Sequence, residues 1–422
     1  MDVSRPDGRL PRGVTVQVGS SPPITPRQQP ASVCVVGLCA SDAPWLSDLY
    51  PRALVRETRF RTRSCAVEQV RLRSRDALQG LPGLDGPTPS RVRDAVRLAL
   101  SSGAEELDVV LARVNGARPW ELDHEDVAEI LGPALADQLG ALLVYPDLGG
   151  PVSVAPGEGA APWERLRRML DAVRRFSPGW TQHYQVALID PPAWWELDRP
   201  ALLHGLLGVD AGLCCWRGGE ASLAAHAWRS ASAVVAGMLA GDEGTVGAPL
   251  DGRSVALPPG RVGARDRRHE LDLAGAATGS DPDPGAWVAL RLHAVRAVAR
   301  VEGEPCFRRP VGVWNLPALR AVKTIHMRVV QAADAFTFRP ATSSEAMSLA
   351  NAVAEALHPF VGRGLLVGPH GMGNPEIGSG VVGQPPEPSL QATIAAQLRP
   401  WSQAVRVRVT VQPGTQPFLE GA

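Results

Sequence analysis

The chain has 422 residues, of which 45% are hydrophobic and 20% charged, so it can form roughly two or three domains and is too apolar to be intrinsically disordered. Lysine plus arginine number 43, and aspartate plus glutamate also number 43; this balance argues against a dedicated nucleic-acid-binding or membrane-surface protein. Lys323 is the only lysine and follows Val322 rather than glycine, which excludes a phosphate-binding loop of the GxxxxGK[ST] type.

The cysteines contain no CxxC pair, so their spacing fits neither a zinc finger nor a disulfide framework. The polar first residues do not resemble a signal peptide, and no uninterrupted apolar run reaches about 18 residues. These features predict a protein that is made and kept in the reducing cytoplasm, without a bound metal, a cofactor or a membrane-inserted segment.

Residues 1–30 are expected to form an N-terminal arm, because prolines recur there too often for a helix. One strand is predicted within this arm. Val14, Val16 and Val18 alternate with polar residues at the period of two that is typical of a strand with one buried face.

Residues 31–240 predict an α/β core lobe, in which short apolar runs alternate with longer helix-like segments. The expected strands are 32–38, 108–114, 141–145, 185–189 and 209–216, and the expected helices are 90–102, 125–138, 162–176, 199–206 and 222–240. Strands separated by helices favour parallel pairing, so the predicted fold class is α/β with several parallel strands.

A loop-rich insertion is predicted at 241–285, followed by a second, C-terminal α/β lobe at 286–400. The expected elements of this lobe are strands at 286–293 and 364–368 and helices at 317–332, 343–358 and 389–398. The whole fold is therefore predicted to be a mixture of α and β structure in two lobes.

Residues 401–422 are predicted to form a C-terminal arm with a strand and a polar tail. Val405, Val407, Val409 and Val411 alternate with polar residues, which places the four valines on one face of that strand. The chain is thus expected to carry an extended arm with one amphipathic strand at each end.

Candidate catalytic residues are few. Asp147 and Asp190 follow predicted strands, where α/β enzymes place catalytic groups, although aspartates at such positions more commonly cap helices or form turns. The GxGxxG pattern at 378–383 is followed by Gln384-Pro385-Pro386, which blocks the helix that dinucleotide binding requires, so a loop is predicted there. We assign no catalytic, cofactor-binding or metal-binding residue, and a cytoplasmic α/β enzyme that uses Asp147 or Asp190 is one alternative.

The two arms favour a different class of protein. A strand on a proline-rich arm has no partner within that arm, so its N–H and C=O groups need the edge of a sheet. A single arm commonly folds back onto its own domain, whereas arms at both ends favour exchange with neighbouring subunits by β-augmentation. Several such links for each subunit would hold a polymer together through multivalency.

Three stretches of the chain resemble contractile tail sheath proteins, the family that forms the sheaths of contractile phages, of tailocins and of contractile injection systems. Residues 12–18 and 30–37 resemble a "PGVYVEE" strand followed by "PTSVAAFVG". Residues 188–192, 211–216, 232–240 and 244–249 are similar to "ILDPP", "AALYYPW" and "SGAVAGVYA…GVWKAPAN". Residues 311–314, 336–340 and 364–366 are similar to "VWGARTL…FEPN…W…GAL", and the strand at 405–411 stands where the family has its C-terminal arm.

The resemblance implies a structural sheath subunit that forms hexameric rings, stacked helically around an inner tube, and contracts to drive the tube through a target envelope. It implies that the arm strands join neighbouring subunits through Val14, Val16, Val18, Val405, Val407, Val409 and Val411. The implied partners are other copies of the chain, the inner tube protein, and baseplate and tail-terminator or cap proteins, without nucleic acid. The implied location is a phage tail or phage-tail-like particle that assembles in the cytoplasm. A sheath-related cap or baseplate component of the same machine is a further alternative.

Overall fold

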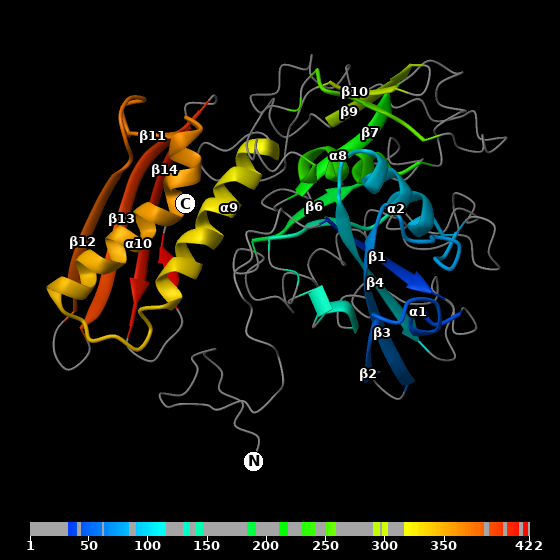
Figure 1. The fold of residues 1–422 in the computed structure, drawn as a ribbon, viewed down its shortest axis with the longest axis horizontal. Helices are drawn as coiled ribbons and strands as arrows, with labels where there is room; N and C mark the ends of the chain where they lie inside the picture. Colours follow the sequence, from blue (N-terminus) through cyan, green and yellow to red (C-terminus); the bar gives the residue numbers. More distant parts are fainter. Residues whose placement is uncertain are drawn as a thin grey trace, which may run out of the picture. The chain divides into compact units, whose positions relative to one another are not determined.

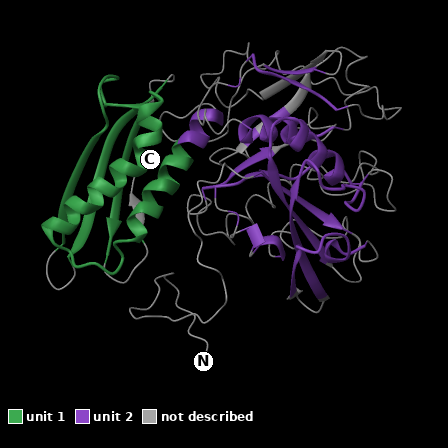
Figure 2. Ribbon diagram, in the orientation of Figure 1, with its two compact units in different colours: residues 1–28, 322–422 green, residues 29–321 purple. Residues whose placement is uncertain are grey.

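The computed structural model of the chain describes residues 33–39, 44–60, 63–83, 90–114, 130–132, 134–135, 138, 140–146, 184–190, 211–217, 229–241, 250, 252–258, 290–295, 298–302, 316–383, 388–399, 403–412 and 417–420. The chain divides into two compact units, unit 2 with residues 29–321 and unit 1 with residues 322–422 and 1–28 (Figure 2). The division falls within helix α9 (Leu316–Asp334), and each unit has a sheet of its own (Figure 1).

Unit 2 is built on a ten-stranded sheet with the order β2-β3-β4-β1-β5-β6-β7-β9-β10-β8. The strands are β1 (Val33–Cys39), β2 (Leu54–Phe60), β3 (Arg63–Arg73), β4 (Glu106–Val114), β5 (Leu142–Val144), β6 (Val186–Ile189), β7 (Ala211–Arg217), β8 (Ser254–Ala256), β9 (Leu290–Val295) and β10 (Val298–Glu302). β1 lies between β4 and β5 and is parallel to both. Its first three residues, Val33, Cys34 and Val35, are wholly buried, as expected of an apolar strand inside a parallel sheet.

The parallel pairing continues from β5 through β6 and β7 to β9. Antiparallel pairs extend the sheet at both sides, with β3 and β2 beyond β4 and with β10 and β8 beyond β9. The predicted α/β class with a parallel-rich sheet is therefore confirmed. The predicted helices at 162–176 and 199–206 lie outside the described residues.

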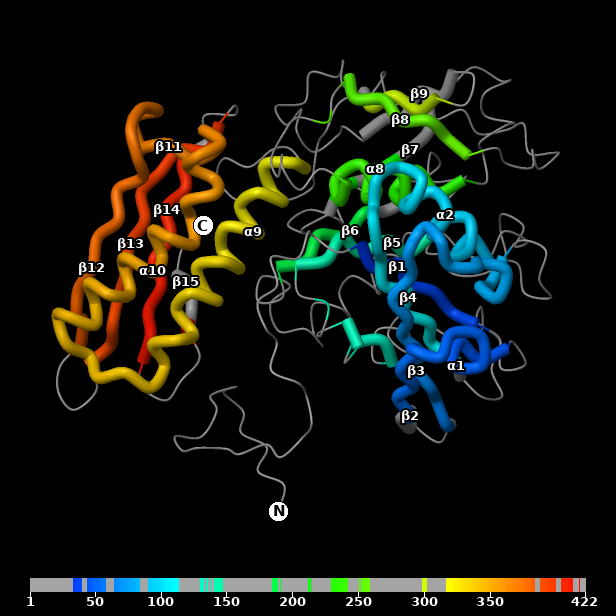
Figure 3. Tube along the Cα trace, in the orientation of Figure 1, coloured from blue at the N-terminus to red at the C-terminus, as the bar shows by residue number. Residues whose placement is uncertain are grey.

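Two helices cover one face of this sheet. α2 (Val92–Ser101) contacts β1 and β4, α8 (Ala231–Ala240) contacts β1, β5, β6 and β7, and the two helices contact each other (Figure 3). All residues of α8 are buried. A Cβ atom added at Gly237 would lie 2.3 Å from the carbonyl oxygen of Ala99, and one added at Gly241 would lie 2.5 Å from that of Gly103. The close approach of α2 to α8 therefore requires glycine at these positions.

Unit 1 has an antiparallel sheet of five strands, β11 (Leu366–Val367), β12 (Glu376–Val382), β13 (Ser389–Leu398), β14 (Gln403–Val411) and β15 (Phe418–Glu420). β13 is central, with β14 on one side and β12 and β11 on the other, and β15 pairs with β14. Helix α10 (Ser343–Gly362) contacts β11, β12 and β13. α9 lies beside α10, because the guanidinium carbon of Arg328 is 5.6 Å from the centre of the Phe360 ring.

Residues 389–398 form the central strand β13, so the helix predicted there is wrong. Leu390, Ala392, Ile394, Ala396 and Leu398 are buried in strict alternation, which is the pattern of a strand with one covered face. The intervening alanine and glutamine residues are good helix formers, but tertiary pairing with β12 and β14 outweighs that local preference.

Two further expectations differ from the structure. Most of the GxGxxG segment at 378–383 belongs to strand β12 rather than to a loop, since its backbone pairs with β13. The predicted C-terminal lobe at 286–400 begins too early, because β9 pairs in parallel with β7 and β10 pairs with β9 and β8 in the sheet of unit 2. β8 comes from the predicted insertion at 241–285, which thus contributes an edge strand to that sheet.

Replacement of Gly237 by alanine tests the contact between α2 and α8. The added methyl group collides with backbone rather than with a movable side chain, so we expect Gly237→Ala to lower the free energy of unfolding by about 1–3 kcal/mol. Gly362→Ala is the matched control, because a Cβ there meets no atom within 4 Å. Thermal denaturation followed by circular dichroism measures both variants. If Gly237→Ala melted at the same temperature as Gly362→Ala, the two helices could move apart without loss of stability.

Candidate assembly surfaces

The predicted valine face of the C-terminal strand exists, and it lies inside unit 1. Val405, Val407, Val409 and Val411 in β14 are at most 3% exposed. β14 pairs with β13 along its whole length, from Gln403 opposite Leu398 to Val411 opposite Leu390. These valines therefore contribute to the core of their own unit, and a contact with another subunit remains a prediction for them. Val14, Val16 and Val18 lie outside the described residues.

β12 forms an edge of this sheet. Its seven residues pair with β13, from Glu376 opposite Ala395 to Val382 opposite Ser389, and none of the described strands pairs with its outer side. Edge strands are commonly protected by proline, by lysine or by several charged residues, whereas β12 contains a single charged residue, Glu376. Among the described strands, only β13 pairs with β12, so its outer N–H and C=O groups form an edge.

The other edge of the sheet is covered only in part. β15 pairs with Arg408, Val409 and Thr410 of β14, so the residues of β14 before Arg408 have a described partner on the β13 side alone. Of the two edges, β12 therefore offers the longer continuous stretch of backbone for an added strand, with seven paired residues.

The two faces of the sheet also differ. The face that α10 contacts carries the buried apolar residues of β13 and β14. The opposite face carries polar residues, among them Thr393, Arg406 and Arg408, which are exposed. An added strand with alternating apolar and polar residues would match this division on both faces.

Asp190, a candidate catalytic residue in the sequence, follows β6 and is buried beside the start of α8. Its carboxylate accepts hydrogen bonds from the Ser230 hydroxyl at 2.5 Å, from the Ser232 backbone N–H at 2.8 Å and from the Ser232 hydroxyl at 2.8 Å. Burial raises the pKa of Asp190, and these hydrogen bonds oppose that rise. These hydrogen bonds join Asp190 to the N-terminus of α8, where Ser230 is the N-cap. Asp147, the other candidate, lies outside the described residues.

A buried ion pair in unit 2 was missed by sequence reasoning. The guanidinium of Arg113 in β4 and the carboxylate of Glu68 in β3 are 2.9 Å apart, with side chains 1% and 0% exposed. Arg113 also donates to the carbonyl oxygen of Pro44 at 3.0 Å and lies 4.3 Å from the centre of the Trp45 ring, and Glu68 accepts from the backbone N–H of Leu46. The pair therefore anchors the segment around α1 (Leu46–Leu49) to the sheet.

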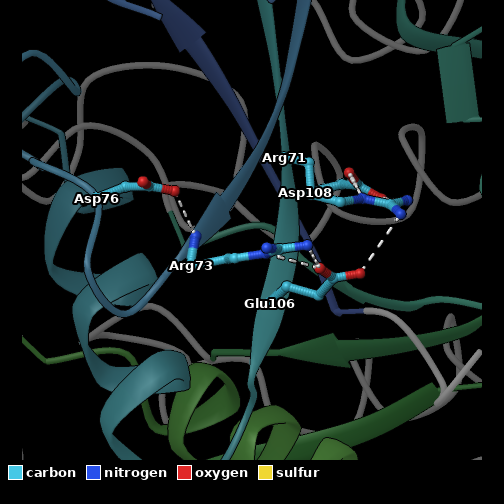
Figure 4. Close-up of polar contacts among 5 residues, drawn as sticks. All are labelled: Arg71, Arg73, Asp76, Glu106 and Asp108. Carbon is cyan, nitrogen blue, oxygen red and sulfur yellow. Dashed lines mark hydrogen bonds and ion pairs between the residues drawn. The ribbon is translucent and has the colours of Figure 1, made fainter. Parts of the chain in front are cut away.

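A second set of ion pairs crosses the same two strands nearer the surface (Figure 4). Arg71 is opposite Asp108 and binds it through two hydrogen bonds of 3.0 Å, whereas Arg73 is opposite Glu106 and binds it at 3.0 and 3.1 Å. Asp76 accepts from the backbone N–H of Arg73 at 2.8 Å. The arginine-rich strand β3 is thus balanced by acidic residues of β4 in register, which fits a structural role for these charges.

No described group of three or more histidine, cysteine, aspartate or glutamate residues is placed to hold a metal ion. Among the described helices, none is both long and apolar enough to cross a membrane. Cys34, Cys39, Cys65 and Cys214 are buried, and burial raises the pKa of Cys39 to about 12.

No protein-family model matches the chain, and no curated protein sequence matches it either. Among solved structures, a chain of the anti-feeding prophage (AFP) baseplate, determined by cryo-EM with 6-fold symmetrisation, is similar with a TM-score of 0.50 and 14% identity over 90% of this chain and 89% of that chain. The AFP helical sheath in its contracted state has a TM-score of 0.48 at 14% identity, covering 97% of both chains. The contracted PVC sheath complex of an extracellular contractile injection system has a TM-score of 0.45 at 12% identity, covering 90% and 88%.

The likeness to the AFP baseplate chain identifies the class of fold. It covers 90% of this chain, so it includes parts of both units. The mixed α/β fold that the sequence predicts is thus shared with a chain of a phage-tail-like particle.

Removal of one partner tests the buried ion pair. Arg113→Met leaves the Glu68 carboxylate buried without its cation, so we expect a loss of about 3–5 kcal/mol in the free energy of unfolding. The double variant Arg113→Met/Glu68→Gln removes both charges and keeps an acceptor for Leu46, so it should recover part of the loss. Arg73→Met, at a side chain that is 49% exposed, should change the value by about 0–1 kcal/mol. Denaturant unfolding measures all three, and an Arg113→Met variant as stable as Arg73→Met would contradict the anchoring role.

Proposed function

We propose that the chain is the sheath subunit of a contractile phage-tail-like particle. In this function it polymerises into hexameric rings, stacked helically around an inner tube, and contracts to drive the tube through a target envelope. The single observation that carries the proposal is the unprotected edge of β12 in a chain whose fold is shared with an AFP baseplate chain. The sequence resemblance to sheath proteins supports it independently.

The proposed link between subunits is the strand at residues 13–18. Added to β12 of a neighbouring copy, a strand of this length forms about four to six backbone hydrogen bonds, each contributing roughly 1 kcal/mol net. One such link is weak, but repetition in every subunit holds a lattice together through multivalency. Because each link would run through the N-terminal arm rather than through the body of the subunit, the subunits could change their packing without separating.

Contraction in this proposal takes its work from subunit packing. Contacts that are better packed in the contracted lattice lower its free energy below that of the extended lattice, and no nucleotide is hydrolysed. The lack of a GxxxxGK[ST] loop fits this source of energy. The inner tube, a baseplate and a terminator or cap protein would be the partners, and assembly would take place in the cytoplasm.

A baseplate component of the same type of particle is the second candidate, because the similar structure with a TM-score of 0.50 is a baseplate. The two functions differ in polymerisation: a sheath subunit stacks into long tubes, whereas a baseplate component forms a single closed layer. The enzyme alternative has less support, since Asp190 is engaged by Ser230 and Ser232 at the start of α8.

Negative-stain electron microscopy of the purified chain, alone and with a candidate inner-tube protein, tests the proposal. We expect striated hollow tubes or stacked six-fold rings. Deletion of residues 1–30 should abolish them and leave a monodisperse protein with unchanged circular dichroism, because the deletion removes the arm that links subunits.

The matched control is a truncation after Gln412, which removes β15 and the tail but keeps β14. Truncation before Gln403 is unsuitable as a control, because it removes a strand whose valines are core residues of unit 1. Tubes formed equally well without residues 1–30 would overturn the arm-linked sheath, and single rings in place of tubes would favour the baseplate component.

A further inference from the structure

Helices α2 and α8 of unit 2 lie side by side and run in the same direction (Figure 3). Gly237 of α8 packs against the backbone of Ala99 at the end of α2, and Gly241 packs against the backbone of Gly103. From the first of these contacts to the second, both chains advance by four residues, which is about one helical turn. The N-terminal ends of the two helices therefore also lie at the same end of the pair.

Two carboxyl groups lie at these N-terminal ends. Asp94 belongs to the first turn of α2, and the register of the two helices, continued back from their glycine contacts, brings it to the height of Ser232 in α8. Ser232 donates to the buried carboxylate of Asp190 through its backbone N–H and through its hydroxyl, both at 2.8 Å. Asp94 and Asp190 thus both lie where the positive ends of two parallel helix dipoles meet.

The two carboxyl groups differ in their hydrogen bonds. Asp190 accepts three, from the Ser230 hydroxyl and from the two donors of Ser232. The Oδ2 atom of Asp94 is buried, and it accepts no hydrogen bond from the described part of the chain. A buried carboxylate oxygen without a donor destabilises the charged form of its group, because the water that it loses on folding is not replaced.

The charges around Asp94 oppose the effect of its burial without cancelling it. Burial raises the pKa of Asp94, whereas the positive charges of Arg229, Arg97, Arg91 and Arg93 lower it, and the net effect is a rise. Arg229 precedes α8, and the other three arginines belong to α2 or its N-cap. Asp94 therefore lies in a positively charged surrounding and is nevertheless a site that disfavours its own negative charge.

The other elements that α2 contacts are α8, β1 and β4, and they add no further charge to this site. α8 contains no charged residue, and the titratable groups of β1 are the buried thiols of Cys34 and Cys39. The charged residues of β4 are Glu106, Asp108 and Arg113, and each of them forms an ion pair with a residue of β3. Proton uptake at this junction is therefore expected at Asp94.

We propose that Asp94 makes the junction of α2 and α8 sensitive to pH, so that uptake of a proton by this residue strengthens the packing of the two helices. A carboxyl group with a higher pKa in the folded than in the unfolded chain binds more protons when the chain is folded. Its contribution to stability therefore rises as the pH falls through the folded-state pKa, and it is complete below the ordinary value of 3.8. The effect belongs to the single chain and is independent of assembly.

Thermal denaturation of the full chain at several pH values tests this role. Asparagine has nearly the shape of protonated aspartate and no charge, so Asp94→Asn should melt about 2–4 °C above the wild type near pH 7.5. The difference should shrink as the pH falls and vanish near pH 4. Glu105→Gln, which removes an exposed carboxylate, is the matched control and should melt within about 1 °C of the wild type at each pH. An Asp94→Asn variant that melts lower near pH 7.5, or a difference that does not change with pH, would overturn the proposal.

Hydrogen–deuterium exchange followed by mass spectrometry locates the effect within the chain. After correction for the intrinsic exchange rate, peptides from α2 and α8 should be better protected near pH 5 than near pH 7.5. Linkage makes this gain up to about tenfold for every unit between the folded and the unfolded pKa of Asp94. Peptides from β13 and β14 are the internal control, and in Asp94→Asn the gain in α2 and α8 should disappear. A gain of equal size in all four elements, or one that persists in Asp94→Asn, would show that other groups bind the proton.

Discussion

The outer edge of β12 pairs with none of the described strands, and the rest of the proposed assembly depends on that edge. An edge strand with one charged residue and no proline pairs readily with any extended segment that reaches it. Within the described residues, β13 supplies partners on one side only. The central strands β13 and β14 hold that edge in place, since the buried valines of β14 and the alternating apolar residues of β13 pack on the face that α10 contacts.

The described parts of unit 2 are closely packed. Its central strand β1 is apolar and buried on both faces, and α2 and α8 approach so closely at Gly237 and Gly241 that a single methyl group would collide with backbone. The Glu68–Arg113 pair ties the segment around α1 to the sheet, while Asp190 and its two serine partners hold the start of α8. Polar groups that could serve catalysis are here engaged in structure. Close-packed interiors of this kind transmit strain with little compression.

Sequence reasoning succeeded where hydrophobic periodicity was strong and failed where local propensity competed with it. The alternating valines of β14 and the apolar runs of β1 and β6 predicted strands correctly, because burial of one or both faces leaves a direct pattern in the sequence. β13 was predicted as a helix. Its apolar residues alternate as those of β14 do, but two of them are alanine, so the strand pattern is weaker. The partners of Arg113 could not be predicted, because a cross-strand pair depends on a register that joins residues 45 positions apart.

The sequence alone determined the class of fold, the parallel-rich core and the amphipathic strand at 405–411, since these follow from composition and from the spacing of apolar residues along the chain. Only the tertiary structure decided that the C-terminal strand is a core member of its own sheet and that residues 376–382 form the edge among the described strands. Whether a strand lies at the edge or in the centre depends on which strands pair with it, and hydrogen bonds between distant segments leave no local trace in the sequence.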